Sequence, residues 1–264
     1  MNRIDATFQS LQEQQSKAFV AYVCAGDPNF DTSLDVIKGL ADAGADIIEL
    51  GVPFSDPLAD GIVNQMAADR ALKAGMTTPR VLELVAEFRK SHQTPIVLFT
   101  YLNPIYTYGY EQFLKDAAEA GIDGLLLLDL PPDEAKLNEE LCKQSDLKNI
   151  TLIAPTTPDD RVEFLAKQSE GFIYALSRTG VTGAHGGPSA AVADTVARIK
   201  AHTDTPVCVG FGITTPDDAA QVAKNADGVV VGSAIVKQIE TQPENAVKAV
   251  VDYTQPLINA AKSV

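Results

Sequence analysis

Short, continuously apolar runs alternate with segments of helical periodicity along the whole chain, and this alternation most constrains the fold. Most of the runs lack the polar–apolar alternation of a strand that has one face in water. Continuous apolar runs are typical of parallel strands that are covered on both faces. We therefore predict eight buried parallel strands, at 18–24, 46–50, 95–100, 124–128, 150–154, 172–176, 206–209 and 228–231.

The segments between these runs carry apolar residues three and four positions apart, which indicates amphipathic helices. In segment 32–43, for example, Leu34, Ile37 and Leu40 fall on one face. Two segments open with Thr-Pro, at 157–158 and 215–216, and Pro is favoured at the first helical position. We predict helices over 32–43, 79–90, 110–120, 132–145, 158–168, 190–202, 216–224 and 245–261, with a helical turn over 234–238.

Strand–helix units without a linker or a break in composition predict an α/β fold, a single closed (β/α)8 or TIM barrel spanning 1–264. The alternative is an open doubly wound sheet, which usually has a glycine-rich turn after its first strand. Here the sequence AGDP at 25–28 contains no GxGxxG motif. We also expect an extra N-terminal helix that caps the barrel bottom with Ile4, Phe8 and Leu11.

The charge balance limits the classes of partner. The chain has 35 acidic and 21 basic residues, a net charge of −14. Nucleic acids and anionic membranes are bound through Lys and Arg, so we expect neither as a partner. The N-terminus lacks the apolar region of a signal peptide, and no run reaches ~18 apolar residues. We therefore expect a cytoplasmic protein.

The cysteines and histidines do not form a metal-binding pattern. Cys24, Cys142 and Cys208 are far apart, and we expect buried free thiols in a reducing compartment. The histidines show no paired spacing, so we expect no zinc site and no metal in the chemistry.

The second predicted strand carries a candidate catalytic carboxyl. In such barrels the chemistry lies at the carboxyl-terminal ends of the strands. Alternation places Ile47 and Glu49 on one face, and Ile48 and Leu50 on the face that suits the helix layer. Glu49 is then expected to point into the barrel mouth. Burial would raise its pKa, as a general acid/base requires, unless Glu49 is a structural residue bonded to a neighbouring loop.

The loop that follows, 51–61, is unusually long for a strand-to-helix connection, which indicates function. Asp56 and Asp60 are its candidate functional residues. The alternative is that both are turn residues before Pro or Gly.

Glycine-rich stretches follow each of the last three predicted strands, at 177–187, 210–213 and 232–233. Glycine lets backbone N–H groups approach an anion, and a helix N-terminus adds a favourable dipole. Together these stretches predict a phosphate site, although simple turns would explain each one singly. Arg178 either assists there or pairs with a neighbouring acid. The residues thus predict a barrel enzyme that acts on a small phosphate ester through carboxyl groups.

Four stretches carry a resemblance to a known family: ELGVPFSDPLADG at 49–61, TYLNP at 100–104, YALSRTGVTG at 174–183, and GFGI at 210–213 with GSAIV at 232–236. Over essentially its whole length, the chain resembles the α subunit of tryptophan synthase. The resemblance implies a carbon–carbon lyase that cleaves indole-3-glycerol phosphate to indole and glyceraldehyde 3-phosphate in L-tryptophan biosynthesis. It also implies an α2β2 complex, in which pyridoxal phosphate belongs to the β subunit and this chain holds no cofactor.

The resemblance also implies residue roles. Glu49 protonates indole C3 and helps to deprotonate the glycerol hydroxyl, while Asp60 accepts the indole N–H and stabilises the cationic tautomer. The implied phosphate ligands are Gly183, Gly212, Gly232 and Ser233. The implied substrate neighbours are Tyr22, Tyr174, Thr182 and Phe211. The implied coupling residues toward the partner are Pro53, Asp56 and Pro57.

Some positions depart from the family's usual pattern. Tyr22, Ile62 and Asn64 stand where Phe, Pro and Ile are usual, and we expect a less rigid helix start and an amide near the indole pocket. The stretch HGGP at 185–188 predicts a more mobile sixth loop. The alternatives are a stand-alone lyase, a binding module that only activates a β partner, and another phosphate-binding barrel such as a phosphoribosyl isomerase.

Overall fold

The computed structural model describes residues 1–130, 135–176, 187–210 and 212–264. Its strands pair in parallel in one sheet, in the order β5-β4-β3-β2-β1-β9-β8-β7-β6. The strands are β1 Ala18–Cys24, β2 Ile47–Gly51, β3 Ile96–Thr100, β4 Gly124–Leu127, β5 Lys148–Asn149, β6 Thr151–Ile153, β7 Ile173–Leu176, β8 Val207–Gly210 and β9 Gly228–Val231.

The two edges of this sheet are joined through a single residue, so the sheet is a closed barrel. Strands β5 and β6 flank Ile150; β5 pairs with β4, and β6 pairs with β7. The Ile150 N–H donates to Leu125 O at 2.9 Å. The pair β5 and β6 is therefore the fifth strand of an eight-unit barrel. This confirms the predicted fold, but the predicted strand 150–154 begins two residues earlier and is divided.

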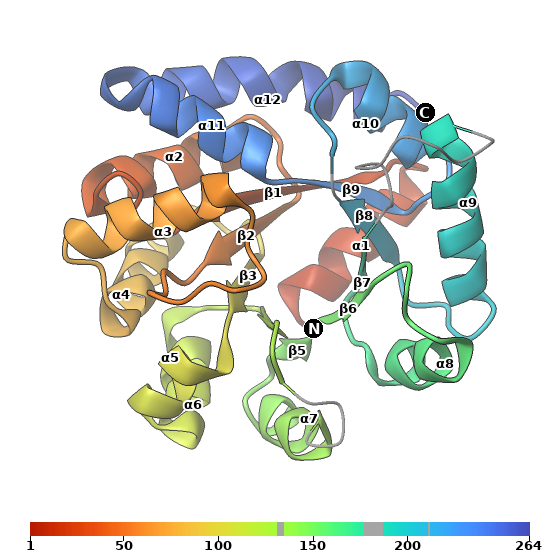
Figure 1. Ribbon diagram of the computed structural model, residues 1–264, viewed down its shortest axis with the longest axis horizontal. Coiled ribbons are helices and arrows are strands. Elements are labelled where there is room, and N and C mark those ends of the chain that lie inside the picture. The colour runs from red at the N-terminus through yellow and green to blue at the C-terminus, as the bar shows by residue number, and fades with distance from the viewer. Residues whose placement is uncertain (131–134, 177–186, 211) are drawn as a thin grey trace.

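Helices surround the strands in Figure 1. They are α1 Arg3–Glu13, α2 Phe30–Asp42, α3 Ile62–Lys73, α4 Thr78–Arg89, α5 Leu102–Tyr108, α6 Tyr110–Ala120, α7 Ala135–Gln144, α8 Asp159–Gln168, α9 Gly187–Lys200, α10 Pro216–Ala223, α11 Ser233–Thr241 and α12 Ala246–Lys262, with a 3-10 turn at Pro243–Asn245. Each predicted helix is present within a few residues. Two helices were not predicted because their apolar period is weak: α5 has only seven residues, and the buried residues of α3 are three small alanines.

The strands separate two apolar clusters, one inside the barrel and one between the barrel and the helices. Val20, Ile47 and Val97 belong to the inner cluster, whereas Ile48 and Leu50 belong to the outer cluster. This confirms the alternation predicted for the second strand. None of the described helices is both long and apolar enough to cross a membrane.

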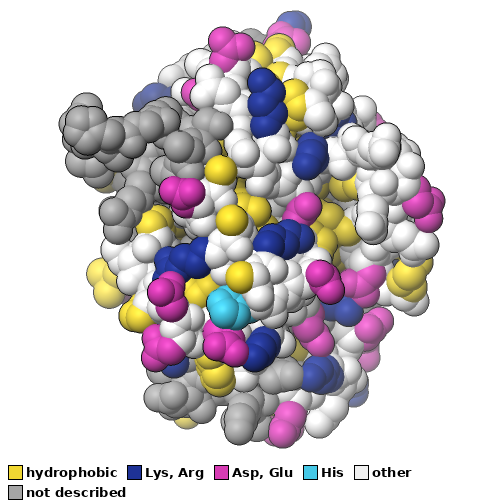
Figure 2. Space-filling model, turned by 90° about the vertical axis from the view of Figure 1, so that its right-hand side faces the viewer, with side chains coloured by type: hydrophobic (Ala, Val, Ile, Leu, Met, Phe, Trp, Pro, Cys, Tyr) yellow, Lys and Arg dark blue, Asp and Glu magenta, His cyan; other side chains and the backbone are white. Residues whose placement is uncertain are grey.

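Positive and negative side chains are mixed over the surface. On the face shown in Figure 2, Lys and Arg lie among Asp and Glu rather than in one basic patch. Several of the described charges form ion pairs, such as Lys167 with Glu163 and Arg198 with Asp159.

The helix α1 closes the amino-terminal end of the barrel, as predicted. Ile4 and Leu11 are buried, and a Cβ added to Gly124 or Gly171 would lie 3.0 Å from the Ile4 side chain. Phe8 packs on Phe172, with ring centroids 5.9 Å apart.

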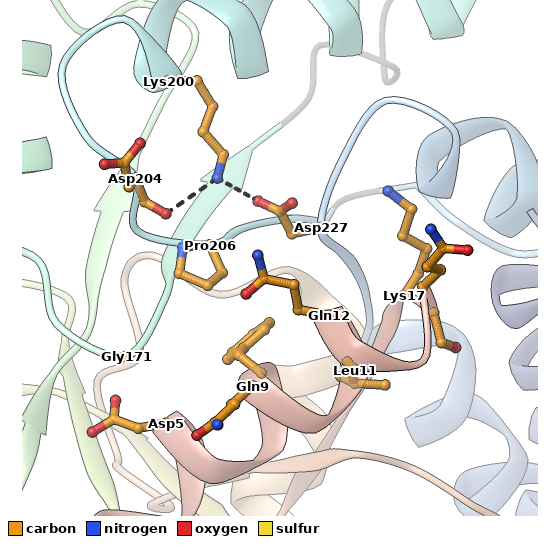
Figure 3. A pocket seen from close by; sticks show the side chains of 13 residues that line it. Asp5, Gln9, Leu11, Gln12, Lys17, Gly171, Lys200, Asp204, Pro206 and Asp227 are labelled. Atoms are coloured by element: carbon orange, nitrogen blue, oxygen red, sulfur yellow. Dashed lines mark hydrogen bonds and ion pairs between the residues drawn. The ribbon is translucent and has the colours of Figure 1, made fainter.

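A hollow of about 590 Å³ lies beside α1 at this end (Figure 3). Lys200 forms an ion pair with Asp227 at 2.7 Å and donates to Asp204 O at 3.4 Å. Asp5, which also lines the hollow, pairs with Lys148 at 2.9 Å. These contacts stabilise the amino-terminal end of the barrel. The charges of Asp5, Lys200 and Asp227 are therefore already paired within the protein.

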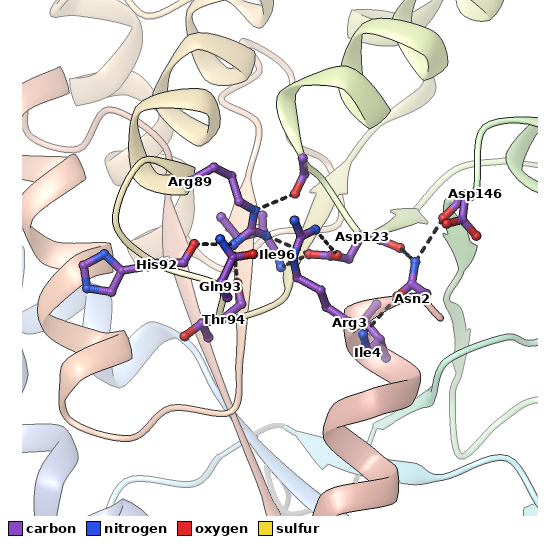
Figure 4. A network of polar contacts seen from close by, with 11 residues as sticks. Asn2, Arg3, Ile4, Arg89, His92, Gln93, Thr94, Ile96, Asp123 and Asp146 are labelled. Carbon is purple, nitrogen blue, oxygen red and sulfur yellow. Dashed lines mark hydrogen bonds and ion pairs between the residues drawn. The ribbon is translucent and has the colours of Figure 1, made fainter.

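The start of the chain is held by the polar network of Figure 4. The Asn2 amide donates to Asp123 O at 2.9 Å, and Arg3 and Arg89 donate to the Asp123 carboxylate at 2.8 and 2.7 Å. Asp123 also accepts the Ile96 N–H at 2.8 Å, so the network ties α1 to the start of β3.

A buried ion pair anchors α3, the helix that follows the long loop. Arg70 donates to both Asp27 oxygens, at 2.8 and 2.9 Å. Asp27 follows β1 and is fully buried, and Glu240 of α11 lies 3.8 Å from Arg70. The pair therefore joins α3 to the first and last strand–helix units.

We expect Arg70→Leu to lower the free energy of unfolding by about 3 kcal/mol, because it leaves the buried Asp27 carboxyl without its partner. Urea unfolding followed by circular dichroism would measure this loss. Lys73→Leu on the same helix is the control, since its pair with Asp69 is exposed and such pairs contribute at most about 1 kcal/mol. Equal losses in the two variants would contradict the anchoring role.

Candidate functional site

The Glu49 side chain points into the barrel, as expected. Glu49 pairs in register with Tyr22 on β1 and with Val97 on β3, and its exposed fraction is 0%. Neither carboxyl oxygen has a hydrogen-bond partner among the described residues. Burial raises the pKa of Glu49 to about 8. A carboxyl in this state holds its proton at neutral pH and can deliver it to a ligand.

Two tyrosines lie around this carboxyl. Its charge raises the pKa values of both Tyr22 and Tyr174, after the larger effect of their burial. The chain makes room for the two rings with glycine. A Cβ on Gly51 would lie 2.5 Å from Tyr22 Oη, and a Cβ on Gly210 would lie 2.4 Å from Tyr174 Oη. The structure therefore brings Tyr22, Glu49 and Tyr174 together inside the barrel.

The Asp60 carboxyl is held at the end of the long loop by groups from other elements. Tyr101, which directly follows β3, donates from its hydroxyl to Asp60 Oδ2 at 2.7 Å. The same hydroxyl accepts the Ala59 N–H at 2.9 Å. Burial raises the Asp60 pKa, whereas hydrogen bonds from Tyr101 and Asn64 lower it. Asp60 is thus an anchored, half-buried carboxyl rather than a simple turn residue.

The other loop candidates lie in different surroundings. Asp56 is exposed and accepts a hydrogen bond from the Ser55 hydroxyl at 2.6 Å. Pro57 is half-buried, and its carbonyl accepts the Asp60 N–H at 3.0 Å. Pro53 is buried at the start of the loop. The loop therefore presents Asp60 from its inner end and Asp56 on its surface.

Part of the predicted phosphate site lies within the described residues. Gly212 has φ +77°, a conformation that favours glycine. Gly232 immediately precedes α11, and no side chain caps this helix N-terminus. Strands β8 and β9 are neighbours, so the segments that follow them lie at the same end of the barrel. The N–H groups of Ser233 and Ala234 have no partner in the described part of the chain. Other predicted site positions lie outside the described residues: Thr182, Gly183 and Phe211, together with the first two residues of the stretch 185–188.

We expect Gly212→Ala to weaken the binding of glycerol 3-phosphate about tenfold, about 1.4 kcal/mol, because the new methyl group would stand where backbone approaches the anion. Gly44→Ala is the matched control, with a similar φ of +95° and room for a Cβ, whose nearest neighbour would be an Ile258 methyl group at 3.9 Å. Calorimetric titration would compare the two variants with the unmodified chain. An unchanged affinity in Gly212→Ala would contradict this phosphate site.

Tyr101 was not predicted as a site residue, although it lies in the stretch TYLNP at 100–104. Its position immediately after a predicted strand, at the carboxyl-terminal end of the barrel, was the available signal. Gly51 and Gly210 were also missed as the residues that accommodate the two tyrosine rings.

The closed parallel barrel thus holds one buried carboxyl that has no partner among the described residues, and a second carboxyl is anchored at the end of the long loop. The comparisons with known proteins identify the family. The family model described as "Tryptophan synthase alpha chain" matches residues 8–262. The chain belongs to the tryptophan synthase alpha chain family, whose members are enzyme subunits.

Relatives of high similarity cover nearly the whole chain. The tryptophan synthase alpha chain of Desulfosudis oleivorans is 49% identical over 240 residues, 91% of each chain. That of Desulfatibacillum aliphaticivorans is 47% identical, covering 99% of this chain and 100% of the relative. The crystal structure of tryptophan synthase subunit alpha from Legionella pneumophila superposes with a TM-score of 0.93 at 38% identity, covering 100% of both chains.

Proposed function

We propose that this chain is the lyase subunit of a tryptophan synthase and cleaves indole-3-glycerol phosphate to indole and glyceraldehyde 3-phosphate. The observation that carries this proposal is Glu49, a fully buried carboxyl with a pKa of about 8 and no partner among the described residues. Family membership supports this choice of substrate, and Asp60 would provide the second carboxyl that the proposed reaction requires.

The reaction needs an acid, a base and an anion. Glu49 donates its proton to indole C3, which converts the ring into a cation. The Asp60 carboxylate accepts the ring N–H and stabilises that cation. Glu49, now ionised, takes the proton from the glycerol hydroxyl next to the ring. The bond between C3 and the glycerol carbon then breaks, its electron pair returns to the ring, and the aldehyde leaves. A positioned acid/base group typically contributes ~10²–10⁴-fold.

The phosphate of the substrate would bind at the uncapped N-terminus of α11, beside Gly212 and Gly232. Backbone N–H groups and the helix dipole favour an anion at this place without any Lys or Arg. Such a site suits a chain whose net charge is −14.

Exposed apolar side chains beside the long loop support the proposal that this chain binds a protein partner. Four of the described large apolar side chains are exposed around it: Leu58, Ile62, Met66 and Tyr106. A mainly apolar hollow of about 450 Å³, lined by residues that include Pro53 and Phe54, adjoins them. Exposed apolar patches of this kind mark interaction sites. We propose that this surface, with Asp56 and Pro57, docks a β subunit that holds pyridoxal phosphate and receives the indole.

The alternatives find less support. A binding module without turnover would not need a buried Glu49 that lacks a partner among the described residues. Another phosphate-binding barrel would not explain the Asp60–Tyr101 contact at the end of the loop. A stand-alone lyase would use the same residues, so only dependence on the partner separates it from a lyase subunit.

As a biosynthetic subunit, the protein is proposed to act in the cytoplasm, without nucleic acid or membrane as a partner.

Indole release from indole-3-glycerol phosphate by the purified chain, alone and with one equivalent of a β subunit, tests this function. The chain contains no Trp, so its own fluorescence does not mask that of indole. We expect slow release by the chain alone and strong stimulation by the β subunit. Fast release alone would favour a stand-alone lyase, and no indole in either condition would overturn the proposal.

A further inference from the structure

One buried hydroxyl joins the long loop to the third strand of the barrel. Tyr101 Oη accepts the Ala59 N–H at 2.9 Å and donates to Asp60 Oδ2 at 2.7 Å. The Tyr101 ring also packs on Phe54, near the start of the same loop, with ring centroids 5.4 Å apart. Tyr101 therefore contacts the loop near both of its ends.

The backbone that carries Tyr101 is itself held in place. Tyr101 directly follows β3 and is only 5% exposed. Its carbonyl accepts the Thr100 hydroxyl at 3.1 Å, and the N–H of the next residue, Leu102, donates to Asp129 Oδ1 at 2.7 Å. A side chain at the end of a strand is placed more precisely than one on a loop. Tyr101 is therefore a fixed point to which the loop is bonded.

The other hydrogen bonds of Asp60 hold its backbone. The Asp60 N–H donates to Pro57 O at 3.0 Å within the loop, and the Gln65 amide donates to Asp60 O at 2.8 Å. Neither contact fixes the rotation of the carboxyl group. The Tyr101 hydroxyl bonds to the carboxyl itself, so it determines where the two carboxyl oxygens lie.

The chemistry of the hydroxyl makes it a donor to Asp60. Its oxygen accepts the Ala59 N–H, which leaves its own hydrogen for the Asp60 carboxylate. Burial and the hydrogen bond to Asp60 raise the pKa of Tyr101, so the hydroxyl keeps its proton at neutral pH. A carboxylate has two acceptor oxygens. With Oδ2 bonded to Tyr101, Oδ1 is the oxygen left to accept a proton donor of a ligand.

We propose that Tyr101 is a positioning residue for Asp60, whose hydroxyl holds Oδ2 and so presents Oδ1 to the ring N–H of the substrate. This inference rests on the proposed function, in which the Asp60 carboxylate accepts that N–H. Tyr101 acts through Asp60. Loss of its hydroxyl would release the carboxyl and the end of the loop without removing any charge.

Tyr101→Phe tests this role, because it removes the hydroxyl and keeps the ring that packs on Phe54. We expect kcat for indole release to fall about tenfold or more, since small misplacements of a reacting group are costly, while the affinity for glycerol 3-phosphate stays unchanged. The matched control is Tyr108→Phe, because Tyr108 donates to Asp116 Oδ2 at the same distance of 2.7 Å. It should leave indole release by the isolated chain within about twofold.

The urea midpoints of the two variants separate positioning from a structural role. Each variant loses one tyrosine–aspartate hydrogen bond of the same length, so we expect similar, small decreases of the midpoint. Only Tyr101→Phe should lose activity. Equal losses of activity in Tyr101→Phe and Tyr108→Phe would overturn the proposal.

A double-mutant cycle tests whether Tyr101 acts through Asp60. In the background of Asp60→Asn the charge that Tyr101 positions is absent. Adding Tyr101→Phe to that variant should therefore lower kcat by no more than about twofold, although it lowers kcat about tenfold in the unmodified chain. Losses that multiply fully in the double variant would show that Tyr101 acts independently of Asp60, against the proposal.

A ligand that cannot be cleaved makes the test independent of turnover. Indole-3-propanol phosphate carries the ring N–H and the phosphate but lacks both free hydroxyls of the glycerol chain. In calorimetric titration we expect Tyr101→Phe to bind it about fivefold more weakly than the unmodified chain does, with unchanged binding of glycerol 3-phosphate. Unchanged affinity for both ligands would overturn this inference even if indole is released normally. Weaker binding of the indole ligand alone, together with no indole release by the unmodified chain, would instead overturn only the proposed function.

Discussion

Glu49→Gln is expected to reduce indole release by about 10²–10⁴-fold while glycerol 3-phosphate still binds normally. Gln has nearly the shape of Glu but can neither donate the proton to indole C3 nor accept one from the glycerol hydroxyl. Single-turnover assays with the β subunit present, together with calorimetric titration of glycerol 3-phosphate, would measure the two effects. Turnover close to that of the unmodified chain would refute the acid/base role.

The same carboxyl predicts the pH dependence of the unmodified chain. In this mechanism Glu49 begins the reaction protonated, and its pKa in the free protein is about 8. We therefore expect kcat/KM to fall as pH rises through about 8, because the ionised form cannot protonate the ring. A profile that stays flat between pH 7 and 9.5 would contradict this assignment.

Glu49→Gln is also expected to stabilise the fold, increasingly so toward high pH. The folded protein keeps the proton up to about pH 8, whereas the unfolded chain releases it near the ordinary pKa of 4.5. Ionisation therefore favours unfolding as pH rises between these values, by on the order of 5 kcal/mol in full. Gln does not ionise, so its stability advantage should grow between pH 5 and 8. The exposed Glu119→Gln is the control, and no widening gap is expected for it.

Asp60→Asn is expected to lower turnover by about 10²–10³-fold, within the range of a positioned charged group. The substitution keeps the size of the side chain and an oxygen that can accept from Tyr101, so the loop anchor and the circular dichroism spectrum should persist. What is lost is the negative charge that stabilises the cationic ring. The loss should therefore appear in kcat rather than in the affinity for glycerol 3-phosphate.

Asp69→Asn is the matched control for Asp60→Asn, because it removes one negative charge from the exposed surface of the neighbouring helix. It should leave turnover within about twofold. If the two variants lose the same activity, general electrostatics rather than the anchored Asp60 carboxylate would explain the result.

The fold could be predicted because strand and helix periods alternate with little interruption. The period of two along the second strand placed Ile47 inside and Ile48 outside, and so required Glu49 to point inward. The missed details are those that local pattern does not encode. The fifth strand divides at Ile150 because its two halves pair with different neighbours.

The candidate site could be predicted only in part. Glu49 and Asp60 stood out because a carboxyl in a buried strand and a long, Asp-containing loop are each unusual in themselves. Tyr101 did not, since its contact with Asp60 joins residues 41 positions apart and depends on how the third strand ends beside the loop.

The sequence by itself determined the barrel, its capped end, and the strand that directs Glu49 inward, because these follow from local periodicity and from the burial of apolar side chains. Only the tertiary structure decided the pKa of the Glu49 carboxyl and the hydrogen bonding of the Asp60 carboxyl. Glu49 titrates near pH 8 because the folded barrel removes it from water without supplying a partner among the described residues. Asp60 is held by the Tyr101 hydroxyl, which meets it only once the barrel has closed.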